Sequence, residues 1–287
     1  MNQFLVFQSD FGLVDGAVSA MKGVAYKVSP ELIVSDVTHD ITPYNVFEAS
    51  YRLFQTVDYW PLGTVFVSVV DPGVGCSRKS VVAKTRKGQY IVTPNNGTLT
   101  HLNEFVGIEE VREIEERTNR LENSQLSYTF HGRDVYAYTG ARLASGTITY
   151  EEVGPKLDVS EVVSLELHGA SRDDTSVTGQ IDILDVRFGS LWTSIPYEMF
   201  KSLGFEFGDD VEVRIFNNKS LVYVNRIVYG RSFADVTVGM PILYMNSVDH
   251  MALAINQGSF AKAYNIGVGA PWTITFAKTD DYSPHKR

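Results

Sequence analysis

Several features are scarce in this sequence, and each absence excludes a class of protein. The single cysteine, Cys76, excludes an internal disulfide and a cysteine-based zinc site, and because no motif pairs it with a histidine we expect a small packing residue. No apolar run is long enough to span a membrane, and the N-terminus enters a strand without the basic and apolar regions of a signal peptide. We therefore expect a cytoplasmic protein that does not contact a membrane.

Basic residues are in the minority. The chain has 25 Lys and Arg against 34 Asp and Glu, which gives a formal charge of −9. This balance argues against a general nucleic-acid surface, although it does not oppose a cationic ligand. The Gly-x-Gly-x-x-Gly loop that cradles a pyrophosphate is also missing, so a ligand without a pyrophosphate fits better and no cofactor is expected.

The length of 287 residues is sufficient for two domains. In the first, unalternated apolar strands follow one another with helical segments between them. This pattern predicts an α/β fold, an N-terminal α/β/α sandwich with a largely parallel central sheet over residues 1–165. The expected strands are 4–7, 32–34, 64–70, 80–85, 89–93 and 111–114; the expected helices end at Val28, run from Thr42-Pro43 to Val57, begin at Thr98, and continue past Ala141.

Two further segments of this domain lead to His131. Residues 115–123 are rich in charge and are expected to form an exposed excursion, and a short strand over 128–130 is expected to deliver His131 to a glycine turn.

After Gly154-Pro155 the helical patterns fade and short strands follow one another. This predicts a smaller C-terminal antiparallel β-barrel over residues 175–287, joined by a linker near 160–175. The tail from Lys278 is expected to fray. The expected strands are 177–186, 191–195, 211–216, 221–224, 242–245 and 272–276.

The buried run 64–70 ends in a turn that carries a carboxylate, Asp71-Pro72-Gly73-Val74-Gly75, with Arg78 shortly after it. In open α/β sheets ligands bind outside the carboxyl ends of the strands, so Asp71 and Arg78 are a candidate site. An Asp-Pro-Gly turn followed by a solvated arginine is an equally ordinary explanation.

Other polar residues stand at similar strand ends. Asp10 follows the first strand, where it would cap a helix or bind a ribose diol. A lone histidine is usually structural, but the place of His131 between a strand and a helix gives a functional role even weight. His39 and Asp40 are adjacent without further ligand spacing, which predicts loop polar groups rather than a metal site.

Taken in order, these motifs resemble a known family. They are Asp10-Phe11-Gly12, Thr42-Pro43, Asp71-Pro72-Gly73-Val74-Gly75 with Arg78, Asn96-Gly97, Thr129-Phe130-His131-Gly132-Arg133-Asp134, Asp185 with Phe188-Gly189, and Asn246-Ser247. The set is similar to the S-adenosylmethionine (SAM) hydroxide adenosyltransferases, also called adenosine-forming SAM hydrolases, which are relatives of fluorinating and chlorinating enzymes. The resemblance covers both expected domains.

The resemblance implies a reaction in which water or hydroxide attacks C5′ of the ribose and displaces methionine, leaving adenosine. The leaving group departs as a neutral thioether, so the reaction needs neither a general acid nor a metal. By resemblance, the residues that hold the water are Asp71, Arg78 and His131. Which of Asp71 and His131 takes the proton is left open.

The resemblance also implies how the substrate is held. Asp10 would bind the ribose hydroxyls and Tyr44 would pack on the ribose, while Phe188 and Phe233 would flank the adenine. Asp185 and Ser247 would meet the methionine part, and Asn96, Phe130 and Ser190 complete the expected substrate-binding set. Because the family forms trimers with the site between the first domain of one chain and the second domain of its neighbour, we expect a homotrimer with SAM as its small-molecule partner.

Departures from the family pattern keep alternatives open. Ser190 and Ser194 stand where the family usually has asparagines, and Ala252 replaces a frequent acidic residue. This drift motivates a SAM- or adenosine-binding sensor without turnover. A SAM-dependent halogenase is disfavoured because the halogenating relatives lack the Asp71 carboxylate, which would repel a halide. A metal-dependent hydrolase is the third alternative to a SAM hydrolase.

Overall fold

The computed structural model describes residues 3–279, which include the start of the tail predicted to fray but not its remainder. The chain divides into two compact units, Met1–Leu165 and Glu166–Arg287. No helix within residues 3–279 combines the length and apolar character that crossing a membrane requires.

The first unit is built on a seven-stranded sheet, with strand order β2-β1-β3-β5-β4-β6-β7. Its strands are β1 (Phe4–Ser9), β2 (Ile33–Thr38), β3 (Val65–Val69), β4 (Ser80–Thr85), β5 (Tyr90–Pro94), β6 (Ile108–Glu113) and β7 (Lys156–Leu157). The strands β2, β1, β3 and β5 are parallel, whereas β4, β6 and β7 pair antiparallel. The predicted largely parallel sheet is therefore confirmed, and β4 and β5 form an antiparallel hairpin.

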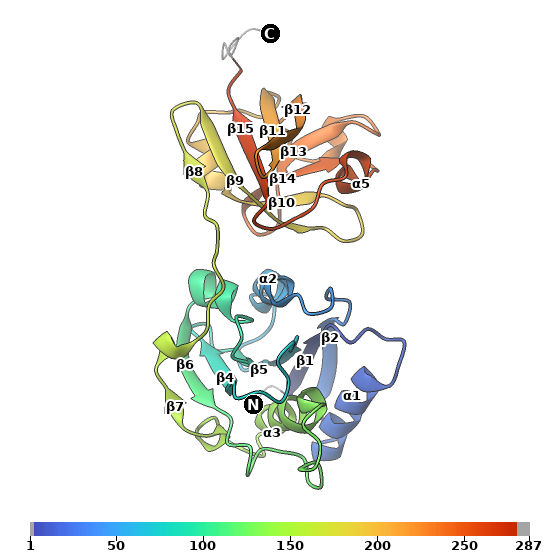
Figure 1. Cartoon of the computed structure of the whole chain (residues 1–287), viewed down its shortest axis with the longest axis vertical. Helices are drawn as coiled ribbons and strands as arrows, with labels where there is room; N and C mark the ends of the chain where they lie inside the picture. Colours follow the sequence, from blue (N-terminus) through green and yellow to red (C-terminus); the bar gives the residue numbers. More distant parts are fainter. Residues whose placement is uncertain (1–2, 280–287) are drawn as a thin grey trace. The chain divides into compact units, whose positions relative to one another are not determined.

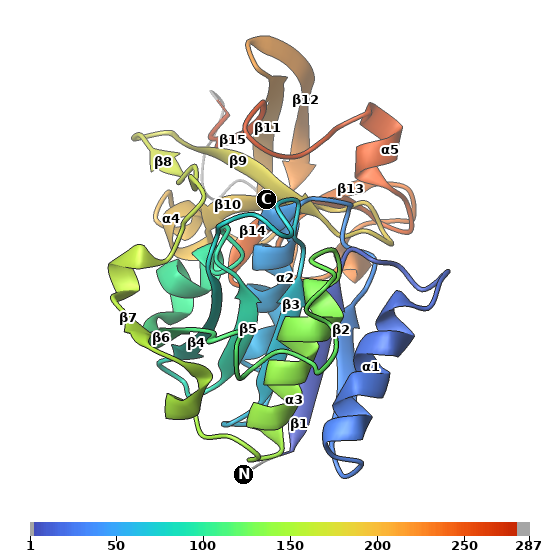
Figure 2. The same ribbon diagram turned by 60° about the horizontal axis from the view of Figure 1, so that its bottom comes forward.

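Helices cover both faces of this sheet (Figures 1 and 2). On one face lie α1 (Ala17–Val28) and α3 (Tyr138–Ala144), the latter preceded by the π-helical segment η2 (Gly132–Ala137). On the other lie α2 (Val46–Val57) and η1 (Leu102–Val106). Alternate residues of each strand point to opposite faces of the sheet and pack into two separate hydrophobic cores. Leu5 and Val67 lie in one core, and Val6 and Phe66 lie in the other. The three-layer α/β/α arrangement is confirmed.

The predicted start of the second helix is wrong by several residues. Thr42 and Pro43 precede the helix, and Asn45 caps α2 by accepting a hydrogen bond from the Glu48 backbone amide at 3.0 Å. Tyr44 has a φ of 69°, which a helix cannot contain. Likewise β2 continues past the predicted residue 34 to Thr38, because its backbone stays paired with β1.

Two predictions for the segment before α3 are also wrong. Residues 115–123 are not simply exposed, because Asn119 and Arg120 are buried. Residues 128–130 do not form a strand, and His131 immediately precedes the helical segment η2. The polarity of this segment suggested solvent exposure, but its side chains bind the neighbouring helix and loop instead, as Asn119 does with the Val153 carbonyl at 2.9 Å.

The second unit is an antiparallel sheet with strand order β12-β11-β15-β9-β10-β14-β13, with β8 paired to β9 (Figure 1). A bridge between Tyr229 and Leu243 joins its two ends, so the sheet is nearly closed into the expected barrel. The sequence analysis did not predict strand β14 or the short helices α4 and α5. The elements are β8 (Ser171–Arg172), β9 (Ser176–Leu184), β10 (Leu191–Pro196), α4 (Tyr197–Lys201), β11 (Asp210–Asn217), β12 (Ser220–Val228), β13 (Pro241–Met245), β14 (His250–Ile255), α5 (Phe260–Tyr264) and β15 (Trp272–Ala277).

Short single turns complete the structure. They are η3 (Glu151–Val153) and η4 (Val159–Glu161) in the first unit and η5 (Phe233–Asp235) in the second.

The packing of α3 on β3 depends on a glycine. A Cβ at Gly140 would lie 2.5 Å from Val67 Cγ2, whereas a Cβ at Gly23 in α1 would have nothing within 4 Å. We expect Gly140→Ala to lower the free energy of unfolding by about 1–2 kcal/mol, since overpacking outweighs the better helix propensity of alanine. Gly23→Ala is the matched control and should raise it by about 0.5–1 kcal/mol. Urea unfolding measures both, and equal effects would contradict this account of the α3 contact.

Candidate active site

The carboxyl ends of β1 and β3 place two carboxylates at the same edge of the sheet. Ser9 pairs with Val69 in the parallel register, and Asp10 and Asp71 follow these strands. Both carboxylates line one cavity of about 330 Å³, together with His131 from the start of η2. The full lining is Asp10, Phe11, Pro43, Tyr44, Val69, Asp71, Val74, Thr129, Phe130, His131 and Gly132.

Asp71 and Arg78 form a bidentate ion pair. Arg78 Nε donates to Asp71 Oδ1 at 2.8 Å, and Arg78 Nη2 donates to Asp71 Oδ2. The third nitrogen, Nη1, donates to the Tyr136 hydroxyl at 2.8 Å, which lies 3.1 Å from Ser80 Oγ. Burial alone would lower the pKa of Arg78, but Tyr136 and Asp71 raise it above its ordinary value. Arg78 is therefore a fixed cation that orients the Asp71 carboxylate.

The turn between these two residues is held by its own backbone. The Val74 amide donates to the Asp71 carbonyl at 3.2 Å, and Gly75 has a φ of +81°, which favours glycine. Cys76 in this turn is exposed, so the prediction that it is a packing residue is wrong. The cause is the tight turn, which directs the thiol away from the core.

His131 is buried and contacts an arginine that the sequence analysis did not single out. Arg120 Nη2 lies 3.0 Å from His131 Nε2. Burial lowers the pKa of His131 below its ordinary value, and the charges of Arg120 and Arg78 lower it further, while Glu116 and Asp71 act in the opposite direction. The imidazole is thus favoured in its neutral form.

Asp10 and Tyr44 meet across the mouth of the cavity. The Tyr44 amide donates to Asp10 Oδ2 at 2.9 Å, and Tyr44 is 73% exposed. Phe130 and Phe11 pack edge to face with ring centroids 5.7 Å apart. The first unit therefore brings Asp10, Tyr44 and Phe130 together around the same cavity as Asp71 and His131.

Asn96 lies at this edge of the sheet but does not line the cavity. Its Nδ2 donates to the Val70 carbonyl at 2.9 Å, and its Oδ1 accepts from the Thr98 hydroxyl at 2.8 Å. The side chain thereby ties the end of β5 to the end of β3. We assign it a supporting position next to Asp71.

In the second unit, four of the predicted residues surround a separate cavity of about 740 Å³. They are Asp185, Phe188, Ser190 and Phe233, and Ser247 does not line it. Tyr244 also lines this cavity and was missed by the sequence analysis; its ring centroid lies 5.2 Å from that of Phe233. Aromatic rings beside a carboxylate and hydroxyls suit a flat base attached to a polar chain.

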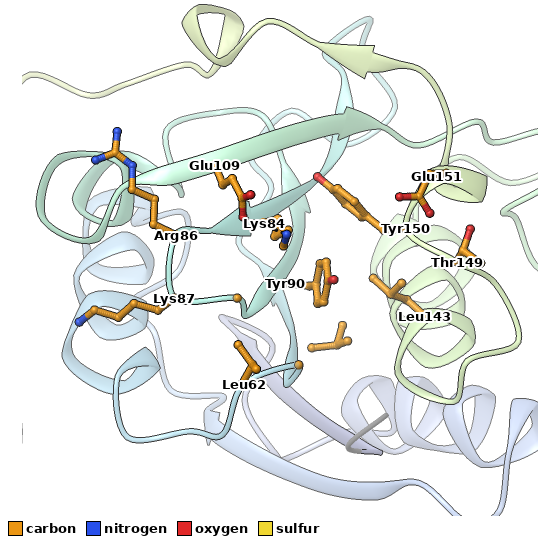
Figure 3. A pocket seen from close by; sticks show the side chains of 13 residues that line it. Leu62, Lys84, Arg86, Lys87, Tyr90, Glu109, Leu143, Thr149, Tyr150 and Glu151 are labelled. Atoms are coloured by element: carbon orange, nitrogen blue, oxygen red, sulfur yellow. Dashed lines mark ion pairs between the residues drawn. The ribbon is translucent and has the colours of Figure 1, made fainter.

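A third hollow, of about 790 Å³, lies at the amino ends of β3 and β5, opposite the edge that carries Asp71 (Figure 3). Tyr90 and Tyr150 form its floor, with ring centroids 5.2 Å apart. Two of its cations are already paired, Lys84 with Glu109 at 2.9 Å and Lys87 with Asp58 at 2.5 Å. It contains none of the predicted site residues, so its size alone does not make it the candidate active site.

Within residues 3–279, no cluster of three or more His, Cys, Asp or Glu side chains is arranged to hold an ion. The His39 ring lies 2.7 Å from Ser9 Oγ and 3.0 Å from Asp36 Oδ1, so it joins β1 to β2.

In a comparison with known proteins, the two units match the two domains of one protein family. Residues 5–154 match the model of the SAM hydroxide adenosyltransferase N-terminal domain, and residues 179–273 match that of its C-terminal domain. The chain is 31% identical to an (R)-S-adenosyl-L-methionine hydrolase of Methanocaldococcus jannaschii, over 91% of this chain and 92% of that protein. It is 28% identical to a fluorinase of Actinopolyspora mzabensis, over 94% of this chain and 96% of that protein.

A solved structure resembles the whole chain. An uncharacterized conserved protein from Thermotoga maritima superposes with a TM-score of 0.88 at 33% identity, covering 96% of this chain and all of that one. With both family domains matched in order, this chain belongs to the SAM hydroxide adenosyltransferase family.

Proposed function

We propose that this protein hydrolyses SAM to adenosine and L-methionine by attack of water on C5′ of the ribose. The observation that carries the proposal is that Asp71, held by its ion pair with Arg78, lines one cavity with His131 and Asp10. Relatives named (R)-S-adenosyl-L-methionine hydrolase, at about 31% identity over most of the chain, support it.

The chemistry requires a water molecule that is held in line with the C5′–S bond. The leaving sulfur becomes a neutral thioether and needs no proton, so the barrier lies in aligning the water and accepting its proton. Each Asp71 oxygen has lone pairs beyond those used by Arg78, and these can accept hydrogen bonds from the water. The Arg78 guanidinium does not line the cavity, but its charge beside Asp71 favours the hydroxide character that the attacking oxygen gains as its proton moves to Asp71.

The charge of the cavity favours water over a halide as the nucleophile. Its lining contains two carboxylates, Asp10 and Asp71, and no lysine or arginine among the described lining residues. Arg78 offsets one of them through the ion pair. A cavity with a net negative lining attracts a sulfonium substrate and repels an anionic nucleophile.

The substrate contacts follow from the same placement. Asp10 would bind the ribose hydroxyls and Tyr44 would pack against the sugar, with Phe130 closing the cavity. In the second unit, Phe188 and Phe233 would flank the adenine. Asp185, Ser190 and Ser247 would meet the edges of the base and the methionine part.

We further propose that the protein is a homotrimer whose sites each use the first unit of one chain and the second unit of its neighbour. The cavity in the first unit carries the polar groups suited to water and ribose, and the cavity in the second carries the aromatic rings. A heterologous interface of this kind closes into a ring when the rotation permits.

Incubation with SAM is the direct test. We expect adenosine and methionine in equal amounts, with one oxygen from ¹⁸O-labelled water in the adenosine, and the same products with chloride present or absent. Chloride-dependent formation of 5′-chloroadenosine would identify a halogenase. Binding of SAM without any product would identify a sensor, and either result would overturn the proposal.

Asp71→Asn removes the proton acceptor while it keeps the size of the side chain. We expect kcat for SAM hydrolysis to fall by about 10²–10⁴-fold, the range typical of a lost acid–base group. Asp40→Asn is the matched control, because Asp40 is an exposed carboxylate that does not line the cavity. A loss of activity in the control as large as that in Asp71→Asn would contradict the assignment.

The shared site can be tested by mixing two inactive chains. Asp71→Asn disables the first unit, and the double change Phe188→Ala with Phe233→Ala disables the second. In co-expressed trimers with random assortment, about a quarter of the sites would combine two intact halves, so activity should return to about a quarter of the normal level. Val186→Ala, an exposed neighbour of Phe188 outside the cavity lining, controls for general effects on the turn. No recovery on mixing would place each site within a single chain.

A further inference from the structure

The contact between Arg120 and His131 determines which nitrogen of the imidazole carries the proton. Arginine has only hydrogen-bond donors and stays protonated, so His131 Nε2, at 3.0 Å from Arg120 Nη2, must be the acceptor. A neutral imidazole that accepts at Nε2 carries its hydrogen on Nδ1. A second proton at Nε2 would point directly at the guanidinium.

The rest of the segment holds Arg120 in place. The Leu121 amide donates to the Asp134 carbonyl at 2.8 Å, and Thr139 Oγ1 donates to the Asn119 carbonyl at 3.1 Å. The residues on both sides of Arg120 are thus bonded to η2 and to α3, the two consecutive helical segments that follow His131. The contact between the two side chains is therefore part of the fold.

The surroundings of the guanidinium also keep it in this position. Arg120 is buried, lies 4.9 Å from the centroid of the Tyr128 ring, and approaches Glu116 at 3.6 Å. The Tyr128 ring in turn packs edge to face with His131, with centroids 6.1 Å apart. The ring orientation of His131 is accordingly fixed from two sides.

The environment of the other ring nitrogen differs from that of Nε2. His131 Nδ1 is buried and makes no hydrogen bond to any described residue, although the side chain lines the cavity with Asp71 and Asp10. A buried N–H without a partner costs free energy, which a ligand or water in the cavity would recover. This points to Nδ1–H as the donor of the site.

We propose that Arg120 is a positioning residue that holds His131 as the neutral Nδ1–H tautomer, so that His131 donates to the attacking water and the proton of that water goes to Asp71. The inference rests on the proposed hydrolysis of SAM. As the oxygen–C5′ bond forms, the C5′–S bond breaks and its electron pair stays on sulfur as the thioether of methionine. One proton of the water passes to the Asp71 carboxylate and then to solvent, and the other remains as the 5′-hydroxyl of adenosine.

The tautomer can be measured without substrate. In ¹⁵N-histidine-labelled protein, long-range ¹H–¹⁵N correlation distinguishes the two ring nitrogens, and His131→Asn assigns the signal among the six histidines. We expect Nδ1 to be protonated and Nε2 to be bare at neutral pH, with a titration below the ordinary pKa of histidine. An Nε2–H tautomer, or a doubly protonated ring at neutral pH, would overturn the inference.

Arg120→Met tests the consequence for turnover. It removes the donor and one of the charges that lower the pKa of His131; Arg78, Glu116 and Asp71 remain. We expect the His131 pKa to rise, kcat to fall about tenfold with KM changed less than about twofold, and a new loss of rate at acid pH as the ring is protonated. Arg120→Lys keeps a charged donor and should restore part of the rate.

Arg117→Met is the matched control, because Arg117 is an exposed arginine in the same segment and is expected to leave the tautomer and the pH profile unchanged. If Arg120→Met is folded and both its tautomer and its pH profile match the unaltered protein, Arg120 has no positioning role. A protein that shows the Nδ1–H tautomer but does not turn over SAM would refute the proposed function and leave the tautomer assignment standing.

Discussion

The partly buried ion pair between Asp71 and Arg78 is the interaction on which the site depends. An ion pair removed from water gains little net stability, because the desolvation of both groups offsets their attraction. Its value here is geometric. Arg78 donates hydrogen bonds to both carboxylate oxygens and to the Tyr136 hydroxyl. That hydroxyl is also within hydrogen-bond distance of Ser80 Oγ at the start of β4. The direction of the Asp71 lone pairs is therefore set by the sheet and by η2 together.

Strand register places the other groups around that pair. Because β1 and β3 are parallel neighbours with Ser9 opposite Val69, the residues that follow them, Asp10 and Asp71, leave the sheet side by side. Gly132 lets η2 approach closely, since a Cβ there would lie 3.1 Å from the Phe11 ring and 3.2 Å from Val69. This approach positions His131, so the cavity follows from the sheet topology and one close helix contact.

The sequence was sufficient for the parts governed by periodicity and turn chemistry. Unbroken apolar runs located β1 and β3, and the carboxylates at their ends located the cavity. It failed for Asn119 and Arg120, which lie in a charged segment that suggests exposure. No local signal shows that residues outside the segment, the Val153 carbonyl and His131, bind these side chains. It also missed β14, whose strand exists because the barrel pairs it with β10 and β13.

The neutral state of His131 is consistent with the charge of the proposed substrate. The groups around the ring and the cavity carry three formal negative charges, on Asp10, Asp71 and Glu116, against two positive charges, on Arg78 and Arg120. With a neutral imidazole the balance is −1, which one sulfonium cation would neutralise. A protonated His131 would cancel that attraction and stand beside two guanidinium groups. A neutral His131 therefore preserves the net negative charge that would attract a cationic substrate.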